Sequence, residues 1–293
     1  MTLQEYFSLW PLFKHAVITS SVLGGTLGVL GVYVILRRMV FLTAAVSQTA
    51  SLGVVLAVFF AGGTSLAWLL NPSVGALILT FGALILIQRT QKSQAERSDA
   101  LLGIMYLIGA AGTLIFAAHI EMELQELNLM LFGSSVAVLY RDFVATLALC
   151  GVILLLQGWW WRGFIASTLD PAGARVRGLP VRMLDGVLFL CLALAIAHST
   201  RVLGPLPTFA FGTLPAYAAL QLSKNLSAAL LWSLVLGVLT GFCGYMIATI
   251  ADTSVGATQT LTGIAVVIVA QGVGYVRKRR MHYVVHAAPS TDS

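Results

Sequence analysis

The chain has 293 residues, of which 58% are hydrophobic and 10% are charged, and its mean hydropathy is +0.92. An average soluble domain is about a quarter charged, so this composition predicts a protein that uses the lipid bilayer as its solvent. The net charge of +6 does not indicate a nucleic-acid partner, because the basic residues stand at the ends of apolar segments. Cys150, Cys191 and Cys243 lie in apolar runs without a CxxC pair, which argues against a disulfide framework or a structural zinc site.

Nine stretches of the chain are long and apolar enough, or nearly so, to cross a bilayer. A span needs about twenty apolar residues, and an unpaired charge at the bilayer centre costs roughly 2.5–3.5 kcal/mol or more. The seventh stretch contains Pro205, Pro207 and Pro215, so it is either a full span or a broken, half-inserted segment. The sequence therefore predicts an all-α integral membrane protein, a polytopic bundle of eight or nine transmembrane helices. The stretches are 16–36, 40–61, 66–88, 100–118, 143–161, 183–200, 202–222, 226–250 and 254–276.

The basic residues predict the orientation of these spans. When Lys and Arg are counted in alternate loops, one set of loops holds fourteen and the other set holds three, which are Lys14, Arg141 and Arg201. Short loops rich in Lys and Arg face the cytoplasm. We therefore expect the N-terminus outside the cell and the C-terminus inside.

No large soluble domain interrupts the spans. We expect one transmembrane domain over residues 1–281, with its longest cytoplasmic connection at about 162–182 and a loop at about 166–182 within it, and a disordered cytoplasmic tail over 282–293. The chain contains no paired carboxylates, no HExxH and no phosphate-binding GxxxxGK[ST]. The sequence therefore predicts that the chain is not an enzyme and needs no cofactor, and that any ATP is hydrolysed by a partner.

Two pairs of glycines have the spacing that brings membrane helices close together. Gly24 and Gly28 lie in the first predicted span, and Gly237 and Gly241 lie in the eighth. A GxxxG pair lets two helix backbones approach each other closely. We interpret both pairs as packing sites rather than functional sites.

The cytoplasmic connection has the signals of a short, well-ended helix. Thr168 or Asp170 can cap its start, and Pro171 suits its first turn. Gly178 can adopt the left-handed conformation at its end, and Pro180 prevents the helix from continuing. The sequence predicts about two turns of helix between two spans. Without further information, this pattern also fits an ordinary cytoplasmic loop.

Residues 169–185, LDPAGARVRGLPVRMLD, resemble the coupling-helix loop of the permease subunits of ABC-3 importers, which reads much like FDPELARARGLPVRRLD in that family. The runs GVLGVYVILRRM at 28–39 and LGPLPTFAFGTLPA at 203–216 are similar to other segments of the family, as is LFG at 131–133. The resemblance covers about residues 16–271.

The resemblance implies the membrane subunit of an importer for divalent transition-metal ions, namely zinc, manganese or iron, in a bacterial cell membrane. It implies three protein partners besides the lipid bilayer: cytoplasmic ABC ATPase subunits, a second permease subunit in a homodimer or heterodimer, and an extracytoplasmic substrate-binding protein. The short cytoplasmic helix would be the coupling helix that receives the motion of the ATPases. Its expected coupling residues are Asp170, Pro171, Arg175, Arg177, Gly178 and Pro180.

The second span departs from the family pattern, which places an Asp and a His one helical turn apart. Ala44 and Gln48 stand at these two positions, and neither side chain replaces a carboxylate or an imidazole as a metal ligand. His198 lies near a span end beside Arg201, where a solvated or hydrogen-bonded histidine is expected. We therefore assign no metal ligand.

A row of polar side chains nevertheless shares one face of this span, because its members are three and four residues apart. Such a row can line a transport pathway, or it can form hydrogen bonds between helices. The candidate pathway residues are Thr43, Ser47, Gln48, Ser51, Thr208 and Thr213.

Three explanations of the missing Asp and His stay open: a degenerate half of a heterodimer, a substrate other than a transition metal, or metal passage through neutral oxygen ligands. The alternative functions are a stand-alone secondary transporter or channel, and an ABC permease for a non-metal substrate. Coupled secondary carriers commonly place ionisable residues at mid-membrane, and the predicted spans hold no Asp or Glu well inside them.

Overall fold

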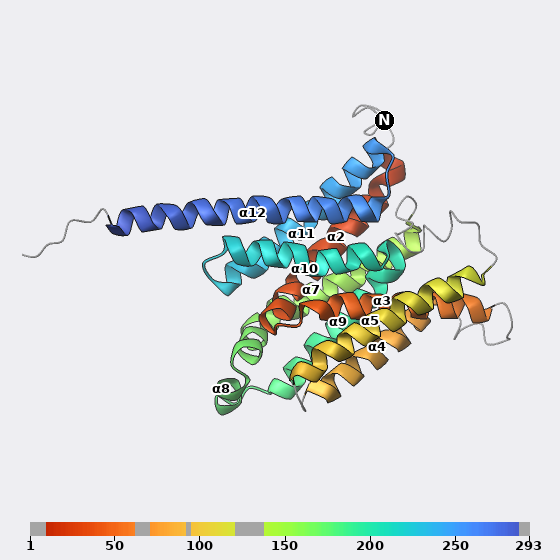
Figure 1. Cartoon of the computed structure of the whole chain (residues 1–293), viewed down its shortest axis with the longest axis horizontal. Helices are drawn as coiled ribbons and strands as arrows, with labels where there is room; N and C mark the ends of the chain where they lie inside the picture. The colour runs from red at the N-terminus through yellow and green to blue at the C-terminus, as the bar shows by residue number, and fades with distance from the viewer. Residues whose placement is uncertain (1–9, 62–70, 92–94, 121–137, 287–293) are drawn as a thin grey trace, which may run out of the picture.

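The computed structural model describes residues 10–61, 71–91, 95–120 and 138–286, and within these ranges the chain is helical and contains no strand. The candidate LFG element at 131–133 lies outside the described residues. Figure 1 shows the helices running roughly alongside one another as a bundle. They are α2 (Trp10–Leu36), α3 (Val40–Ala61), α4 (Pro72–Gln91), α5 (Ala95–Ala118), α7 (Tyr140–Leu169), α8 (Pro171–Val176), α9 (Val181–Leu203), α10 (Pro205–Leu222), α11 (Leu226–Ala251) and α12 (Val255–His286).

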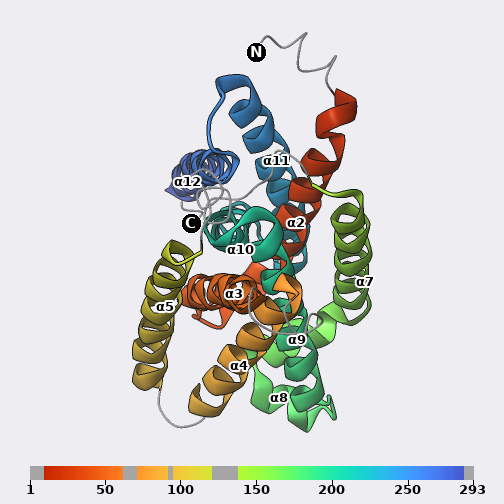
Figure 2. The same ribbon diagram turned by 90° about the vertical axis from the view of Figure 1, so that its right-hand side faces the viewer.

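Eight of the described helices are long and apolar enough to cross a membrane, and α10 is a further helix of 18 residues inside the bundle. It packs against α2, α3, α9, α11 and α12, and Figure 2 shows it in the middle of these helices. Pro205 occupies its first turn, where a missing backbone N–H costs little, and Pro215 lies inside the helix. The expected bundle of eight or nine helices is confirmed, and α10 is unbroken because its neighbours bury it.

The helix α7 is longer than the span predicted at 143–161. Trp160 has non-helical backbone angles, φ −109° and ψ 20°, so the helix is kinked there. The part before the kink is apolar, and the part after it continues to Leu169 and carries α8 (Figure 1). The sequence pattern ended at Arg162, because hydropathy reports the membrane segment and not the cytoplasmic extension of a helix.

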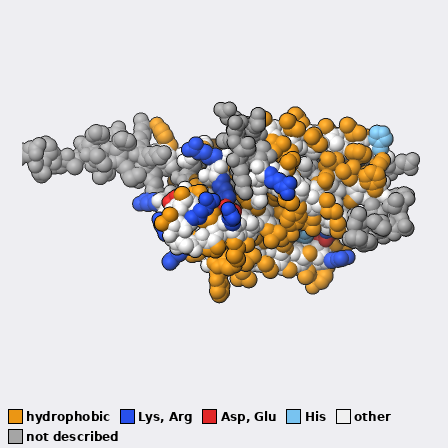
Figure 3. All heavy atoms as spheres, turned by 90° about the horizontal axis from the view of Figure 1, so that it is seen from below, with side chains coloured by type: hydrophobic (Ala, Val, Ile, Leu, Met, Phe, Trp, Pro, Cys, Tyr) orange, Lys and Arg blue, Asp and Glu red, His pale blue; other side chains and the backbone are white. Residues whose placement is uncertain are grey.

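The basic ends of the helices gather where the orientation rule places the cytoplasm. Arg37 and Arg38 after α2, Arg175 on α8 and Arg182 on α9 surround one hollow. Figure 3 shows most of the Lys and Arg side chains toward this end of the bundle, with fewer at the other. The two helix ends that carry Asp142 and Arg201 meet at the opposite end, where the two residues form an ion pair.

The two GxxxG pairs face each other across the α2–α11 crossing. A Cβ atom on Gly24 would lie 2.5 Å from the carbonyl oxygen of Gly237, and one on Gly241 would lie 2.6 Å from that of Ser20. Gly28 approaches the Ser233 carbonyl in the same way, at 2.7 Å. The prediction that both pairs are packing sites is confirmed, because only glycine lets these backbones touch.

Candidate coupling surface and membrane pathway

The short helix α8 is built as its sequence predicts. The Asp170 carboxylate accepts a hydrogen bond from the Gly173 N–H at 2.8 Å, and Pro171 occupies the first turn. Gly178 ends the segment in the left-handed region, at φ 77°, a conformation that other residues rarely adopt. Thr168, the other candidate cap, serves a different purpose, because its hydroxyl accepts hydrogen bonds from Arg37.

The outer face of α8 is open to solvent. Ala174 is the buried residue of this helix, with 2% of its surface exposed, and it packs inward. Val176 is 89% exposed, and Arg175 and Arg177 are exposed beside it. The segment therefore presents an apolar side chain between two basic ones, a combination that suits contact with another protein.

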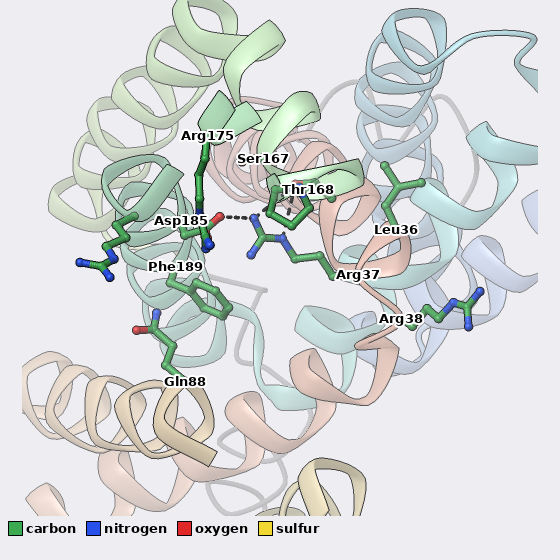
Figure 4. Close-up of a pocket in the computed structure, with 12 residues that line it drawn as sticks. Leu36, Arg37, Arg38, Gln88, Ser167, Thr168, Arg175, Asp185 and Phe189 are labelled. Atoms are coloured by element: carbon green, nitrogen blue, oxygen red, sulfur yellow. Dashed lines mark hydrogen bonds and ion pairs between the residues drawn. The ribbon is translucent and has the colours of Figure 1, made fainter. Parts of the chain in front are cut away.

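Arg37 contacts the chain on both sides of α8, at Thr168 before the helix and at Asp185 after it. The Arg37 guanidinium forms an ion pair with Asp185 and donates to the Thr168 hydroxyl at 3.3 Å from Nη2 and 3.4 Å from Nε. It also lies over the Phe189 ring, with Cζ 5.6 Å from the ring centroid. We call Arg37, Thr168, Asp185 and Phe189 the arginine clip (Figure 4). The sequence marked Arg37 only as a topology signal, since its partners lie more than 130 residues away.

A hollow of about 840 Å³ opens beside the arginine clip, between the ends of α2 and α4 and the segment α8–α9. Among its described lining residues, four are arginines and Asp185 is the single carboxylate, so its charge suits an acidic or polar protein surface better than a metal cation. Its basic and amide side chains are Arg37, Arg38, Gln88, Arg175 and Arg182.

The structure brings Thr43, the first member of the polar row of α3, next to α10. Thr43 is buried against Gly212, where a Cβ atom would lie 3.1 Å from the Thr43 Cγ2. The Thr43 hydroxyl donates to the Val40 carbonyl at 3.1 Å, and the Ser47 hydroxyl donates to the Ala44 carbonyl at 3.0 Å. Both hydroxyls are therefore satisfied by their own helix.

The other pathway candidates are Thr208, Thr213, Ser51 and Gln48, and of these only Gln48 is partly exposed. Thr208 donates to the Ser199 hydroxyl on α9 at 2.9 Å, and Thr213 donates to the Phe209 carbonyl of its own helix at 2.9 Å. Ser51 is buried. Gln48 is half-buried, and α5 approaches its backbone at Gly109. Thr208 thus serves helix packing, and Gln48 keeps the largest free surface of the set.

No group of three or more His, Cys, Asp and Glu residues in the described part of the chain is arranged to hold a metal ion. Ala44 is buried, with 3% of its surface exposed. The expectation for His198 is confirmed, since its Nε2 atom lies 2.8 Å from the Thr146 hydroxyl. Next to it, Arg201 and Asp142 form the ion pair that joins α9 to α7.

Together, the apolar bundle and the capped cytoplasmic segment define a multi-pass membrane permease. The sequence matches the ABC 3 transport family over residues 10–274, and the chain belongs to this family. It is a multi-pass protein of the bacterial plasma membrane.

Curated relatives and a solved structure support this placement. The chain is 29% identical over 253 residues to the manganese transport system membrane protein MntC of Bacillus subtilis, and the match covers 83% of this chain and 57% of that protein. It is 24% identical to the high-affinity zinc uptake system membrane protein ZnuB of Haemophilus influenzae, over 86% of this chain and 94% of ZnuB. A chain of the solved complex of PsaBC from Streptococcus pneumoniae with Fab has the same fold, with a TM-score of 0.79 at 24% identity, and the match covers 92% of this chain and 95% of that one.

Proposed function

We propose that this chain is the permease subunit of an ABC importer for a divalent transition-metal ion and that α8 couples it to separate ATPase subunits. The observation that carries the proposal is the form of α8, a six-residue helix capped by Asp170, ended by Gly178 and exposed on its outer face. A rigid helix outside the membrane can transmit a push from a soluble partner into the bundle.

The metal substrate is proposed from the named functions of the relatives, which are manganese transport, zinc uptake and, for YfeD of Yersinia pestis, chelated iron transport. The chain spans 57% of the length of the Bacillus MntC protein. We propose that two permease subunits form the pathway and that an extracytoplasmic binding protein delivers the ion.

The membrane pathway is proposed to run along the polar face of α3 and its neighbour α10. Thr43, Ser47 and Ser51 supply neutral oxygens on this face, and Gln48, which is partly buried, adds an amide. We propose one membrane domain over residues 1–281 and a tail over residues 282–293. The helix α12 continues to His286, and residues 287–293 lie outside the described part.

The coupling proposal predicts that the double variant Gly178→Ala with Pro180→Ala separates ATP hydrolysis from transport. Alanine at φ 77° is strained, and the loss of Pro180 removes the fixed φ of the residue before α9. Both changes move α8 relative to α9 without touching the core. We expect ATP-driven uptake by the reconstituted complex to fall about tenfold or more, equivalent to about 1.4 kcal/mol of coupling free energy, while ATP hydrolysis persists.

Gly82→Ala on α4 is the matched control, because a Cβ atom there meets no atom within 4 Å. It should leave uptake and thermal unfolding unchanged. Normal uptake by the double variant would remove α8 from its coupling role, whereas co-purification of the ATPase with the wild-type chain and not with an Arg175→Glu, Arg177→Glu variant would support it.

A further inference from the structure

The arginine clip joins three helices at the point where α8 leaves the bundle. Arg37 follows α2, Thr168 lies in the last turn of α7, and Asp185 lies in the first turns of α9. Thr168 precedes α8 and Asp185 follows it, so one guanidinium contacts the chain on both sides of the helix. Figure 4 shows Arg37 reaching between these two flanks.

The helix α8 has few other connections to the bundle. Among the described helices, it packs mainly against its flanking helices α7 and α9, and Ala174 is its buried residue. The hollow of about 840 Å³ beside it leaves that side without packed side chains. Motion of α8 therefore reaches the bundle through its two flanks, which are where Arg37 binds.

The apolar contacts of these flanks allow sliding more readily than the clip does. The Tyr33 and Phe164 rings meet edge-on, with centroids 6.0 Å apart, and Leu184 and Leu188 are buried in the same core. Such contacts have no fixed direction. The planar guanidinium forms directional bonds to two different side chains and stacks on a third, which fixes the relative placement of all three helices.

We propose that Arg37 is a positioning residue that transmits the displacement of α8 to α2. The proposal rests on the coupling function proposed above. The helix α2 is suited to receive the motion, because Gly24 and Gly28 hold it against α11, and Gly31 holds it against α10 at Gly212. A shift of α2 is thereby passed to the helix that carries Thr208 and Thr213.

A purely stabilising ion pair would give a different result from a transmission element. The side chains of Arg37 and Asp185 are 16% and 34% exposed, and partly exposed pairs contribute little to stability. Loss of the pair should therefore change the melting temperature slightly. Its loss should change the number of ions transported per ATP much more, since coupling between sites typically corresponds to about 5- to 150-fold.

The test compares Arg37→Gln with wild type in vesicles that hold the permease with its ATPase and binding protein, with uptake of ⁵⁴Mn²⁺, ⁶⁵Zn²⁺ or ⁵⁵Fe²⁺ and phosphate release measured in the same vesicles. We expect Arg37→Gln to lower the ions transported per ATP about fivefold or more, with ATP hydrolysis retained. Arg37→Lys should regain part of the ratio, because lysine keeps the charge for Asp185 but lacks the fork that also reaches Thr168. Lys224→Gln, which removes an exposed cation elsewhere, should match wild type.

The reversed pair, Arg37→Glu with Asp185→Arg, keeps the test decisive where a single variant folds poorly. It should transport more ions per ATP than Arg37→Glu alone. An unchanged number of ions per ATP in a folded Arg37→Gln complex, or no gain in the reversed pair, would overturn the proposed role of Arg37. ATP-driven uptake by the wild-type complex would still support the coupling function in that case. A wild-type complex without ATP-driven uptake would overturn both.

Discussion

Gly24→Ala is expected to destabilise the bundle by about 1–3 kcal/mol, the usual cost of forcing an extra methyl group into a closely packed site. The added Cβ atom would lie 2.5 Å from the Gly237 carbonyl oxygen and 3.2 Å from its carbonyl carbon. Both are backbone atoms, so no side-chain rotation relieves the contact. The helices α2 and α11 must then separate, which also opens the neighbouring contacts at Gly28 and Gly241. Thermal unfolding in detergent, followed by size-exclusion chromatography, measures the effect.

Gly158→Ala is the matched control on α7, where a Cβ atom meets nothing within 4 Å. In a helix interior, alanine is favoured over glycine by roughly 0.5–1 kcal/mol, so this variant should unfold at the wild-type temperature or above it. Equal stability of the two variants would show that the α2–α11 crossing is wider than the structure places it.

The second large effect is expected from Ala44→Asp combined with Gln48→His. These residues are one turn apart on α3, and the change supplies a carboxylate and an imidazole on one helix face. Without metal, a carboxyl group at the buried position 44 should destabilise the chain. With Zn²⁺ or Mn²⁺ bound, the melting temperature should recover, because a ligand at 100 times its Kd stabilises a protein by about 2.7 kcal/mol.

The control for this pair of changes is Ala44→Asn with Gln48→Asn, which introduces amides at both positions and neither a carboxylate nor an imidazole. Its melting temperature should not respond to metal. An equal metal response in wild type, control and double variant would show that the α3 face is not where the ion binds. A response confined to the double variant would show that metal ions reach the α3 face and that the native residues there do not hold one.

Local signals in the sequence were sufficient to predict α8 and to mark the two GxxxG pairs as packing sites. The Asp170 cap, the Pro171 first turn and the left-handed Gly178 act within a few residues of one another, so their spacing determines their geometry. The GxxxG pairs were visible for the same reason. That the two pairs face each other required the structure, because they are more than 200 residues apart.

Other features depend on tertiary contacts and left no usable local signal. The helix α10 has prolines and modest hydropathy, and its surrounding helices decide that it stays intact. The described part of α4 begins at Pro72, and the start of the predicted span, at 66–70, lies outside the described residues. In the sequence, Arg37 was one of the basic residues at a span end that indicate topology. Its contact with Asp185, 148 residues away, is visible only in the structure.

The spacing of the polar residues on α3 and α10 did not predict the hydrogen-bond partners of their hydroxyl groups. Their spacing predicts that the α3 row shares one face, and Thr43, Ser47 and Thr213 direct their hydroxyls to carbonyls of their own helices. Ser and Thr commonly do so in membrane helices.

ATP-driven uptake of ⁵⁴Mn²⁺, ⁶⁵Zn²⁺ and ⁵⁵Fe²⁺ into proteoliposomes tests the central claim most directly, with the wild-type chain reconstituted alone and with its ABC ATPase and binding protein. The account predicts uptake of at least one of these ions that requires ATP and the complete complex, and no uptake by the chain alone. Uptake by the isolated chain without ATP would identify a secondary transporter or channel, and the complete complex transporting none of the three metals would contradict the proposed substrate.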